Sequence, residues 1–158
     1  MIRQALTADA PDIVALWNYF IRNTSVTFNS SEKTREDVEM LIQERGPGFL
    51  VADDNGTLAG FATVFQFRGG VGYAHTGEHT VILSPELQGR GHGRALMEAL
   101  FDVARGQGLH SLFAGVSAEN PDGRAFHAAL GFSEVARLPE VGRKFGRWMD
   151  LILMQRFL

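Results

Sequence analysis

The feature that most constrains this chain is a glycine-rich segment between an apolar, β-branched run and a long helical pattern. The segment consists of Gln88, Gly89, Arg90, Gly91, His92, Gly93 and Arg94. It follows the run 80–83 and precedes a helical pattern that starts at Ala95. Glycines at alternate positions let a backbone approach an anion, and the helix adds its positive N-terminal end. We therefore predict a phosphate-binding loop, with an ordinary glycine-rich connector as the alternative.

Two familiar phosphate loops do not fit this segment. A P-loop needs Lys and then Ser or Thr after its last glycine, and this chain has Arg94 and Ala95 there. The dinucleotide fingerprint needs a third glycine three residues after the second, and that position is again Arg94. The pattern that remains is Gln-x-x-Gly-x-Gly at a strand-to-helix junction.

Length, charge and cysteine content limit the class of protein. The 158 residues are enough for one domain, which we expect to span residues 1–158. A net charge of -3 without a basic run argues against nucleic-acid binding, and the lack of cysteine excludes disulfides and thiolate metal sites. The first residues lack a signal-peptide pattern, and no apolar stretch reaches the length of a membrane span. We expect a soluble cytoplasmic protein that binds neither nucleic acid nor membranes.

Hydrophobic periodicity predicts an alternation of strands and helices. Asp53 to Gly56 is the strongest hairpin signal, and Gly60 indicates a bulge or a close backbone approach. In chain order the pattern predicts a strand at 2–6, a helix that starts within 7–12 and ends near 22, a helix at 34–44, strands at 49–52, 58–67 and 78–83, a helix at 95–107, a strand at 111–116, a helix at 120–130, and strands at 132–137 and 147–157. This order predicts an α/β protein, a mixed sheet with helices on its faces.

Several motifs in this order resemble those of the GNAT superfamily of N-acetyltransferases. Residues 88–93 are similar to its signature for the diphosphate of acetyl-coenzyme A (acetyl-CoA), and 120–132 resemble its second signature. Residues 76–81 and 142–150 are similar to the phosphinothricin acetyltransferase-like branch. That branch acetylates the α-amine of small amino-acid-like compounds such as phosphinothricin, methionine sulfoximine and methionine sulfone. The resemblance covers nearly the whole chain.

The resemblance implies a fold, a co-substrate and an assembly. The fold would be a mixed, mostly antiparallel sheet of about seven strands flanked by about four helices. Acetyl-CoA would be the co-substrate, with its diphosphate on residues 88–94 and no metal. The backbone of 81–83 (Val81, Ile82 and Leu83) would bind the acetyl and pantetheine carbonyls if this strand diverges from 111–116. Asn120 would bind the pantetheine arm or cap its own helix. A homodimer is typical of the branch, with apolar surface around Trp148.

Two residues are candidates for the chemistry. Glu78 would take the proton from the attacking amine, or would only pair with a substrate ammonium or a nearby arginine. His127 stands where many members of the superfamily carry a tyrosine that protonates the leaving thiolate, and a histidine suits that task. The alternative for His127 is a half-buried helix residue bonded to a backbone carbonyl. We predict direct attack by the amine, since the chain has no cysteine nucleophile.

The acceptor side is less well defined. Its candidate residues are Phe28, Tyr73, His75, Glu78, His79 and Thr80, with simple packing as the alternative for the aromatic ones. His75 to His79 also match the zinc-peptidase pattern H-x-x-E-H, but a strand would hold those imidazoles about 13 Å apart.

The chain also departs from the branch, more on the acceptor side than on the co-substrate side. On the acceptor side Asn29 replaces a common Glu and residues 69–71 lack an Arg-Pro pair. On the co-substrate side Gly123 replaces a common Ser, which would cost one hydrogen bond to the co-substrate. A carboxylate-binding arginine would have to be Arg68 or Arg143.

The sequence thus predicts an acetyl-CoA-dependent N-acetyltransferase for the primary amine of a small amino acid or analogue. The alternative is a non-catalytic sensor or scaffold that binds acyl-CoA and has lost the acceptor chemistry.

Overall fold

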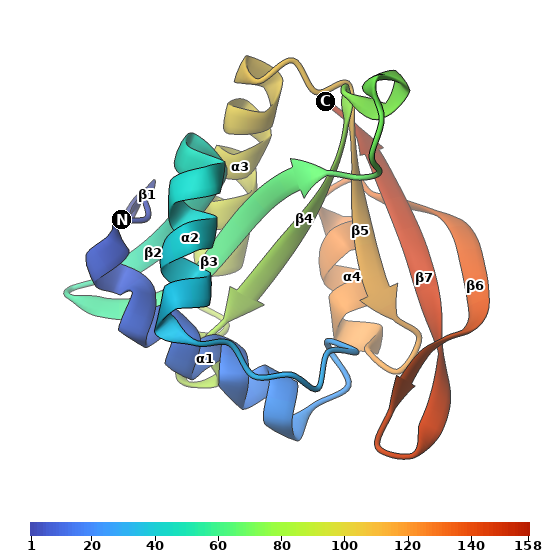
Figure 1. The fold of residues 1–158 in the computed structure, drawn as a ribbon. Coiled ribbons are helices and arrows are strands. Elements are labelled where there is room, and N and C mark those ends of the chain that lie inside the picture. Colours follow the sequence, from blue (N-terminus) through green and yellow to red (C-terminus); the bar gives the residue numbers. More distant parts are fainter.

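The seven strands form one sheet in the order β1-β2-β3-β4-β5-β7-β6, seen in the computed structural model, which describes residues 1–158 (Figure 1). Every neighbouring pair is antiparallel except β4 and β5. The strands are β1 (Ile2–Gln4), β2 (Phe49–Asp54), β3 (Thr57–Gln66), β4 (Thr76–Leu83), β5 (Ser111–Ser117), β6 (Ser133–Lys144) and β7 (Arg147–Phe157). The predicted mixed, mostly antiparallel sheet is confirmed.

Four α-helices cover the two faces of this sheet: α1 (Ala10–Asn23), α2 (Arg35–Arg45), α3 (His92–Gly106) and α4 (Pro121–Ala129). Figure 1 shows α1 and α2 in front of the sheet and α3 and α4 behind it. Thr34 caps α2 as the sequence predicts, since its hydroxyl accepts from the Asp37 N–H at 3.1 Å and the Asp37 carboxylate accepts from the Thr34 N–H at 2.8 Å. None of the helices combines the length and the apolar character needed to cross a membrane.

Strand alternation divides the buried residues between two cores. Along β2, Phe49 and Val51 join the core under α1 and α2, while Leu50 and Ala52 join the larger core under α3 and α4. Ile13, Trp17 and Ile21 of α1 fall at helical spacing and fill the first core. The sheet is therefore buried on both faces in this region. Strands β2 and β3 form the well-packed part of the sheet next to β4.

The β4–β5 pair opens along its length. The two strands pair only from Thr76 with Ser111 to His79 with Ala114. Beyond that point β4 continues to Leu83 and β5 to Ser117, and the strands diverge in Figure 1. The sheet thus has a gap in its middle. The backbone groups of β4 that face this gap have no hydrogen-bond partner in β5.

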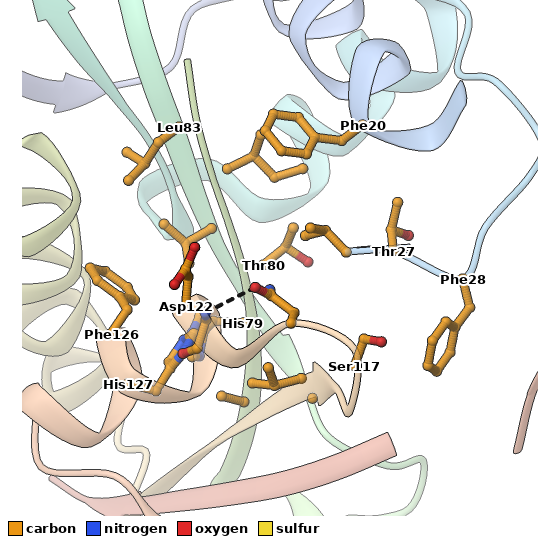
Figure 2. A pocket seen from close by; sticks show the side chains of 18 of the residues that line it. Phe20, Thr27, Phe28, His79, Thr80, Leu83, Ser117, Asp122, Phe126 and His127 are labelled. Atoms are coloured by element: carbon orange, nitrogen blue, oxygen red, sulfur yellow. Dashed lines mark hydrogen bonds between the residues drawn. The ribbon is translucent and has the colours of Figure 1, made fainter. Parts of the chain in front are cut away.

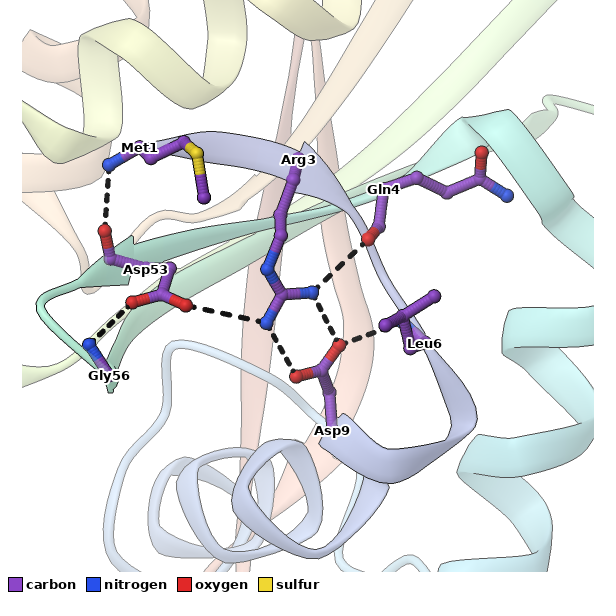
Figure 3. A network of polar contacts seen from close by, with 7 residues as sticks. All are labelled: Met1, Arg3, Gln4, Leu6, Asp9, Asp53 and Gly56. Atoms are coloured by element: carbon purple, nitrogen blue, oxygen red, sulfur yellow. Dashed lines mark hydrogen bonds and ion pairs between the residues drawn. The ribbon is translucent and has the colours of Figure 1, made fainter.

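Polar contacts hold the short β1 strand against the β2–β3 hairpin (Figure 3). The Arg3 guanidinium donates two hydrogen bonds of 2.9 Å to Asp9 and one of 3.5 Å to Asp53. Asp53 also accepts from the Gly56 N–H at 2.7 Å, so it fixes the hairpin that the sequence predicts. The hydrogen bond with Arg3 lowers the pKa of the Asp9 carboxyl.

Gly60 shows the close approach that the sequence indicates. A Cβ atom there would lie 2.6 Å from the Ile82 carbonyl oxygen. The register between β2 and β3 also shifts just beyond the opposite residue, Ala52, so the expected bulge is present as well.

Most predicted boundaries lie within two residues of the observed ones, and two are wrong by more. The helix α3 begins at His92 and not at Ala95, because left-handed Gly91 precedes the first turn and His92, Gly93 and Arg94 belong to the helix. The strand β6 extends to Lys144 and not only to 137. Its register shifts between Leu138 and Gly142, and an edge strand tolerates the intervening Pro139.

Candidate active site

A cavity of about 620 Å³ occupies the gap between β4 and β5 (Figure 2). In Figure 2, Phe126 and His127 of α4 lie on one side, and Phe20 of α1 with Thr27 and Phe28 of the following loop lie on the other. The remaining walls are residues 78–83 of β4, residues 114–117 of β5 and Leu151 of β7. The cavity therefore joins segments from almost the entire chain at the one place where the sheet opens.

The backbone of β4 points unpaired N–H groups into this gap. Ser84 donates its N–H to Ala59 of β3 at 2.8 Å, and the Thr76 carbonyl accepts from Phe67 at 3.0 Å, so even-numbered positions face β3. Because neighbouring residues of a strand face opposite sides, the N–H groups of Val81 and Leu83 face the gap, while that of Ile82 faces β3. Strand β5 does not pair with them. The divergence that the sequence analysis required is thus present.

The glycine loop has the geometry of an anion cradle. Gly89 and Gly91 have φ angles of 78° and 85°, in the left-handed region that favours glycine. No side chain caps α3, whose first N–H groups follow directly after Gly91. A Cβ atom at Gly93 would lie 2.7 Å from Leu83 and 3.0 Å from Phe126, so this glycine lets the helix start approach β4 and α4. These features suit a diphosphate at the helix N-terminus.

The basic side chains of the loop lie next to acidic ones. Arg90 and His92 lie 3.5 and 3.4 Å from the Asp54 carboxylate, and Arg94 lies 3.3 Å from Glu98. Of the loop residues, only Gln88 lines the cavity. Asn120 lines it too, and its side-chain oxygen accepts from the Gly123 N–H at 3.0 Å, so the expected helix cap is present.

Glu78 projects from β4 into the cavity. It is half-buried, and one of its oxygens would lie 3.9 Å from a Cβ atom placed on Gly115 of β5. Burial raises the pKa of its carboxyl, and no charged neighbour contributes to that shift. The carboxylate is therefore not neutralised by an arginine of this chain and is available to a ligand.

His79 and His127 form a buried pair in the wall of the cavity. Their Nε2 atoms are 2.9 Å apart, and His127 Nδ1 lies 2.7 Å from the Gly123 carbonyl oxygen. A carbonyl only accepts, so His127 carries its proton on Nδ1 and its Nε2 accepts from the Nε2–H of His79. His79 Nδ1 is buried without a partner. Burial lowers the pKa of His127 and, together with the nearby His127 ring, that of His79 to about 3, so both rings are neutral at neutral pH.

Other predicted acceptor-side residues divide into two groups. Phe28, His79 and Thr80 line the cavity with Glu78. Tyr73 and His75 do not line it, and His75 Nδ1 lies 2.8 Å from the Gly108 carbonyl oxygen beyond the paired end of β4. Neither of the two arginines considered for a carboxylate lines it. Arg68 lies 5.7 Å from the centre of the Tyr73 ring and Arg143 4.6 Å from that of Trp148.

Sequence reasoning missed several residues of this site. Trp17 and Phe20 read as core positions of α1, yet both line the cavity, as do Ser117 and Leu151. It also missed the contact between His79 and His127, which are 48 residues apart. No cluster of three or more His, Asp or Glu side chains is arranged to hold a metal ion.

Comparison with known proteins identifies the family. Residues 13–132 match the acetyltransferase (GNAT) family. The chain belongs to this family. It is 36% identical over 157 residues to the L-amino acid N-acyltransferase MnaT of Escherichia coli (strain K12), with 98% of this chain and 91% of that protein covered. It is 34% identical over 161 residues to a phosphinothricin N-acetyltransferase of Streptomyces coelicolor, covering 98% and 94% of the two chains.

A solved structure gives the same result for the fold and the co-substrate. The acetyltransferase yncA from Salmonella typhimurium, solved with its cofactor acetyl-CoA, superposes with a TM-score of 0.95 at 35% identity. The superposition covers 100% of this chain and 93% of that one. The predicted family, fold class and enzyme class are confirmed: this GNAT protein is an N-acetyltransferase that uses acetyl-CoA.

Proposed function

We propose that this GNAT enzyme acetylates the primary amine of a small amino acid or analogue, in the class of phosphinothricin, methionine sulfoximine and methionine sulfone. Two observations support this class. Relatives named for amino acids and phosphinothricin align with it over nearly their whole length. The single feature that carries the proposal is the unpaired Glu78 carboxylate, which faces the cavity beside the free N–H groups of β4.

Glu78 takes the proton from the acceptor ammonium, directly or through a water molecule. The raised pKa of the Glu78 carboxyl makes it a better proton acceptor than an exposed glutamate. The neutral amine then attacks the acetyl carbonyl directly, since the chain has no cysteine to form an acyl-enzyme. The N–H groups of Val81 and Leu83 face the gap, where they donate hydrogen bonds to the acetyl and pantetheine carbonyl oxygens.

The loop 88–94 and Asn120 hold the co-substrate. Acetyl-CoA supplies the acetyl group as a reactive thioester. Left-handed Gly89 and Gly91 and the uncapped start of α3 receive its diphosphate, with Arg90, His92 and Arg94 at the rim. Arg90 and His92 would exchange their contacts with Asp54 for the stronger ones to phosphate.

His127 can act as the predicted leaving-group acid only after it gains a second proton. His127 donates from Nδ1 to Gly123 and accepts at Nε2 from His79, so it has no free proton in this arrangement. To protonate the thiolate it must first gain a second proton, which its lowered pKa opposes. The proposal therefore predicts that His127→Asn affects turnover far less than a change at Glu78.

We also propose that the enzyme is a cytoplasmic homodimer without nucleic-acid or membrane partners. Exposed apolar residues of the β6–β7 hairpin support the dimer: Trp148 is 58% exposed, and Val141 and Phe145 of the same hairpin are exposed as well. Light scattering of the wild type and of Trp148→Lys tests this, with a dimer expected for the former and a monomer for the latter.

The test of the proposed function is release of free CoA from acetyl-CoA across a panel of amines. The panel contains amino acids, methionine sulfone, methionine sulfoximine and phosphinothricin, with polyamines and peptide N-termini as controls. Turnover on the amino-acid-like compounds, with identification of the N-acetyl product by mass spectrometry, is expected. No turnover on any compound, together with tight acetyl-CoA binding, would support the sensor alternative and contradict the proposal.

A further inference from the structure

One wall of the cavity is a loop without helix or strand, residues 24–29, which we call the acceptor loop. It connects α1 towards α2, and Val26, Thr27, Phe28 and Asn29 line the cavity opposite α4. Its own hydrogen bonds are long, with Val26 N–H to the Thr24 hydroxyl and Asn29 N–H to the Thr27 hydroxyl both at 3.3 Å. Shorter hydrogen bonds join only its two ends to neighbouring residues, with the Thr24 hydroxyl donating to the Phe20 carbonyl at 2.7 Å and Asn29 accepting from the Ser31 N–H at 2.8 Å.

Lys144 supports this loop from the far end of the chain. It is the last residue of β6 and only 4% exposed, although lysine is among the residues most often found in solvent. Its ammonium donates to the carbonyl oxygens of Thr24 at 2.6 Å and Thr27 at 2.8 Å. These acceptors are 120 and 117 residues away in sequence. Two short charge-assisted hydrogen bonds thus hold the acceptor loop at its first residue and at its middle.

A second contact joins the same two segments. The Phe28 ring packs directly on Gly142 of β6, where a Cβ atom would lie 2.5 Å from the ring carbon Cδ2. Gly142 is buried and has no left-handed φ, so the close approach of the ring, and not backbone strain, explains a glycine at this position. Lys144 and Gly142 therefore shape the loop together, one through its backbone and the other through its aromatic side chain.

Lys144 cannot act by touching the reactants. It does not line the cavity, and its ammonium is bonded to the two loop carbonyls. Its hydrogen bonds reach neither the glycine loop nor the free part of β4, so we expect acetyl-CoA binding not to depend on it. A change at Lys144 would move the acceptor wall alone.

We propose that Lys144 is a positioning residue for the acceptor, because its ammonium holds the acceptor loop where Thr27 and Phe28 form the wall of the cavity that contains Glu78. This inference rests on the proposed function, in which the acceptor amine enters at this wall. Lys144 then sets the affinity for the acceptor, while Glu78 and the β4 backbone set the rate of the chemical step.

Kinetics of two variants test the proposal. Lys144→Met keeps the aliphatic stem and removes the donors, and Gly142→Ala keeps Lys144 but displaces the Phe28 ring. Lys144→Met is expected to raise the acceptor KM by about 10-fold or more, because it removes two charge-assisted hydrogen bonds. Gly142→Ala is expected to raise the acceptor KM as well, because the added Cβ displaces the Phe28 ring. In both variants the acetyl-CoA Kd and kcat should stay within about 3-fold of the wild type. The control is Arg137→Met, which removes an exposed cation of the same strand, paired with Asp150, and should change none of these constants.

Hydrogen exchange gives a measurement that needs no turnover. In Lys144→Met without substrates, amides of residues 24–29 should exchange faster, while those of β4 and α3 should not. If the wild type acetylates no amine, the proposed function fails and the exchange experiment still tests the role of Lys144. Unchanged exchange in the acceptor loop, or an acetyl-CoA Kd weakened as much as the acceptor KM, would overturn the inference. If Lys144→Met does not fold, Lys144→Gln, whose shorter and uncharged side chain cannot make the same two hydrogen bonds, is measured in the same two ways.

Discussion

The groups that we expect to hold acetyl-CoA come mainly from one run of chain, residues 81–94, whereas the wall for the acceptor is assembled from segments far apart in sequence. The first set comprises the open edge of β4, the left-handed glycines and the start of α3. The second combines Thr27 and Phe28 with Glu78, Ser117 and Leu151. Lys144, 117 residues from Thr27, holds part of it in place.

This difference bears on how such an enzyme changes its specificity. A local phosphate site depends on a few glycines and the start of one helix. We therefore expect a variant in which the strand–loop–helix unit is unchanged to bind the co-substrate as before. The acceptor wall depends on contacts between distant elements, so a substitution in α1, β6 or β7 alters it without touching the co-substrate. The departures from the phosphinothricin branch at Asn29 and residues 69–71 lie outside the glycine loop, as this view expects.

The largest expected effect is that of Glu78→Gln, which tests whether the two sides are separable. The amide keeps the shape of the side chain but cannot accept the ammonium proton, so kcat should fall by about 100-fold or more. The acetyl-CoA Kd, measured by calorimetry, should not change. Glu86→Gln, an exposed glutamate just before the glycine loop, is the matched control. Equal turnover in Glu78→Gln and the wild type would remove Glu78 from the mechanism.

The His79–His127 pair, which links β4 to α4, predicts an acid-dependent loss of stability. His79 has a pKa of about 3 in the folded protein because it is buried, against about 6.5 when unfolded. Between these values only the unfolded state binds the proton, so stability falls as the pH falls, by up to about 1.4 kcal/mol per pH unit. The lowered pKa of His127 acts in the same direction.

Urea unfolding of the wild type and of His79→Asn at pH 7 and pH 5 measures this loss. The variant should lose much of the pH dependence, whereas His110→Asn, at an exposed histidine, should keep it. An identical pH dependence in His79→Asn and the wild type would contradict the assignment of a neutral buried pair.

A smaller and strictly local effect is expected for Gly91→Ala on the co-substrate side. Gly91 has a φ angle of 85°, and a side chain in this region costs about 1 kcal/mol, so the acetyl-CoA Kd should rise by about 5-fold. The acceptor KM at saturating acetyl-CoA should not change. Gly106→Ala, a helical glycine whose added Cβ would contact nothing, should leave both constants unchanged. A rise in the acceptor KM alone would show that the two sides are not independent.

The smallest effect concerns a region that belongs to neither side. Thr34→Ala removes the side-chain cap of α2 and should lower the free energy of unfolding by about 1 kcal/mol, measured by urea denaturation. Both substrate constants should stay at their wild-type values, because α2 does not line the cavity. Ser30→Ala, in the exposed loop before α2, is the neutral comparison.

The errors of the sequence analysis arise where contacts between distant elements override a local sequence pattern. Residues 92–94 were expected in a loop because glycines and a histidine interrupt the helical pattern, yet Gly91 can begin a helix there. The end of β6 was missed because Pro139 and Gly142 disfavour a strand, and pairing with β7 overrides that preference. Tyr73 and His75, predicted near the acceptor from their place before β4, stay outside the cavity lining because the strands are still paired at that end.

By itself the sequence determined the family and the order of the elements, and it predicted the glycine loop as a phosphate site and Glu78 as the base, because each rests on short motifs of residues that are neighbours in the chain. Only the tertiary structure decided that β4 and β5 part after His79, that His79 bonds His127, and that Lys144 reaches the acceptor loop. These contacts join residues 48 to 120 positions apart. Such pairs form because a buried polar group needs a hydrogen-bond partner, and no local pattern in the sequence records which distant residue will supply it.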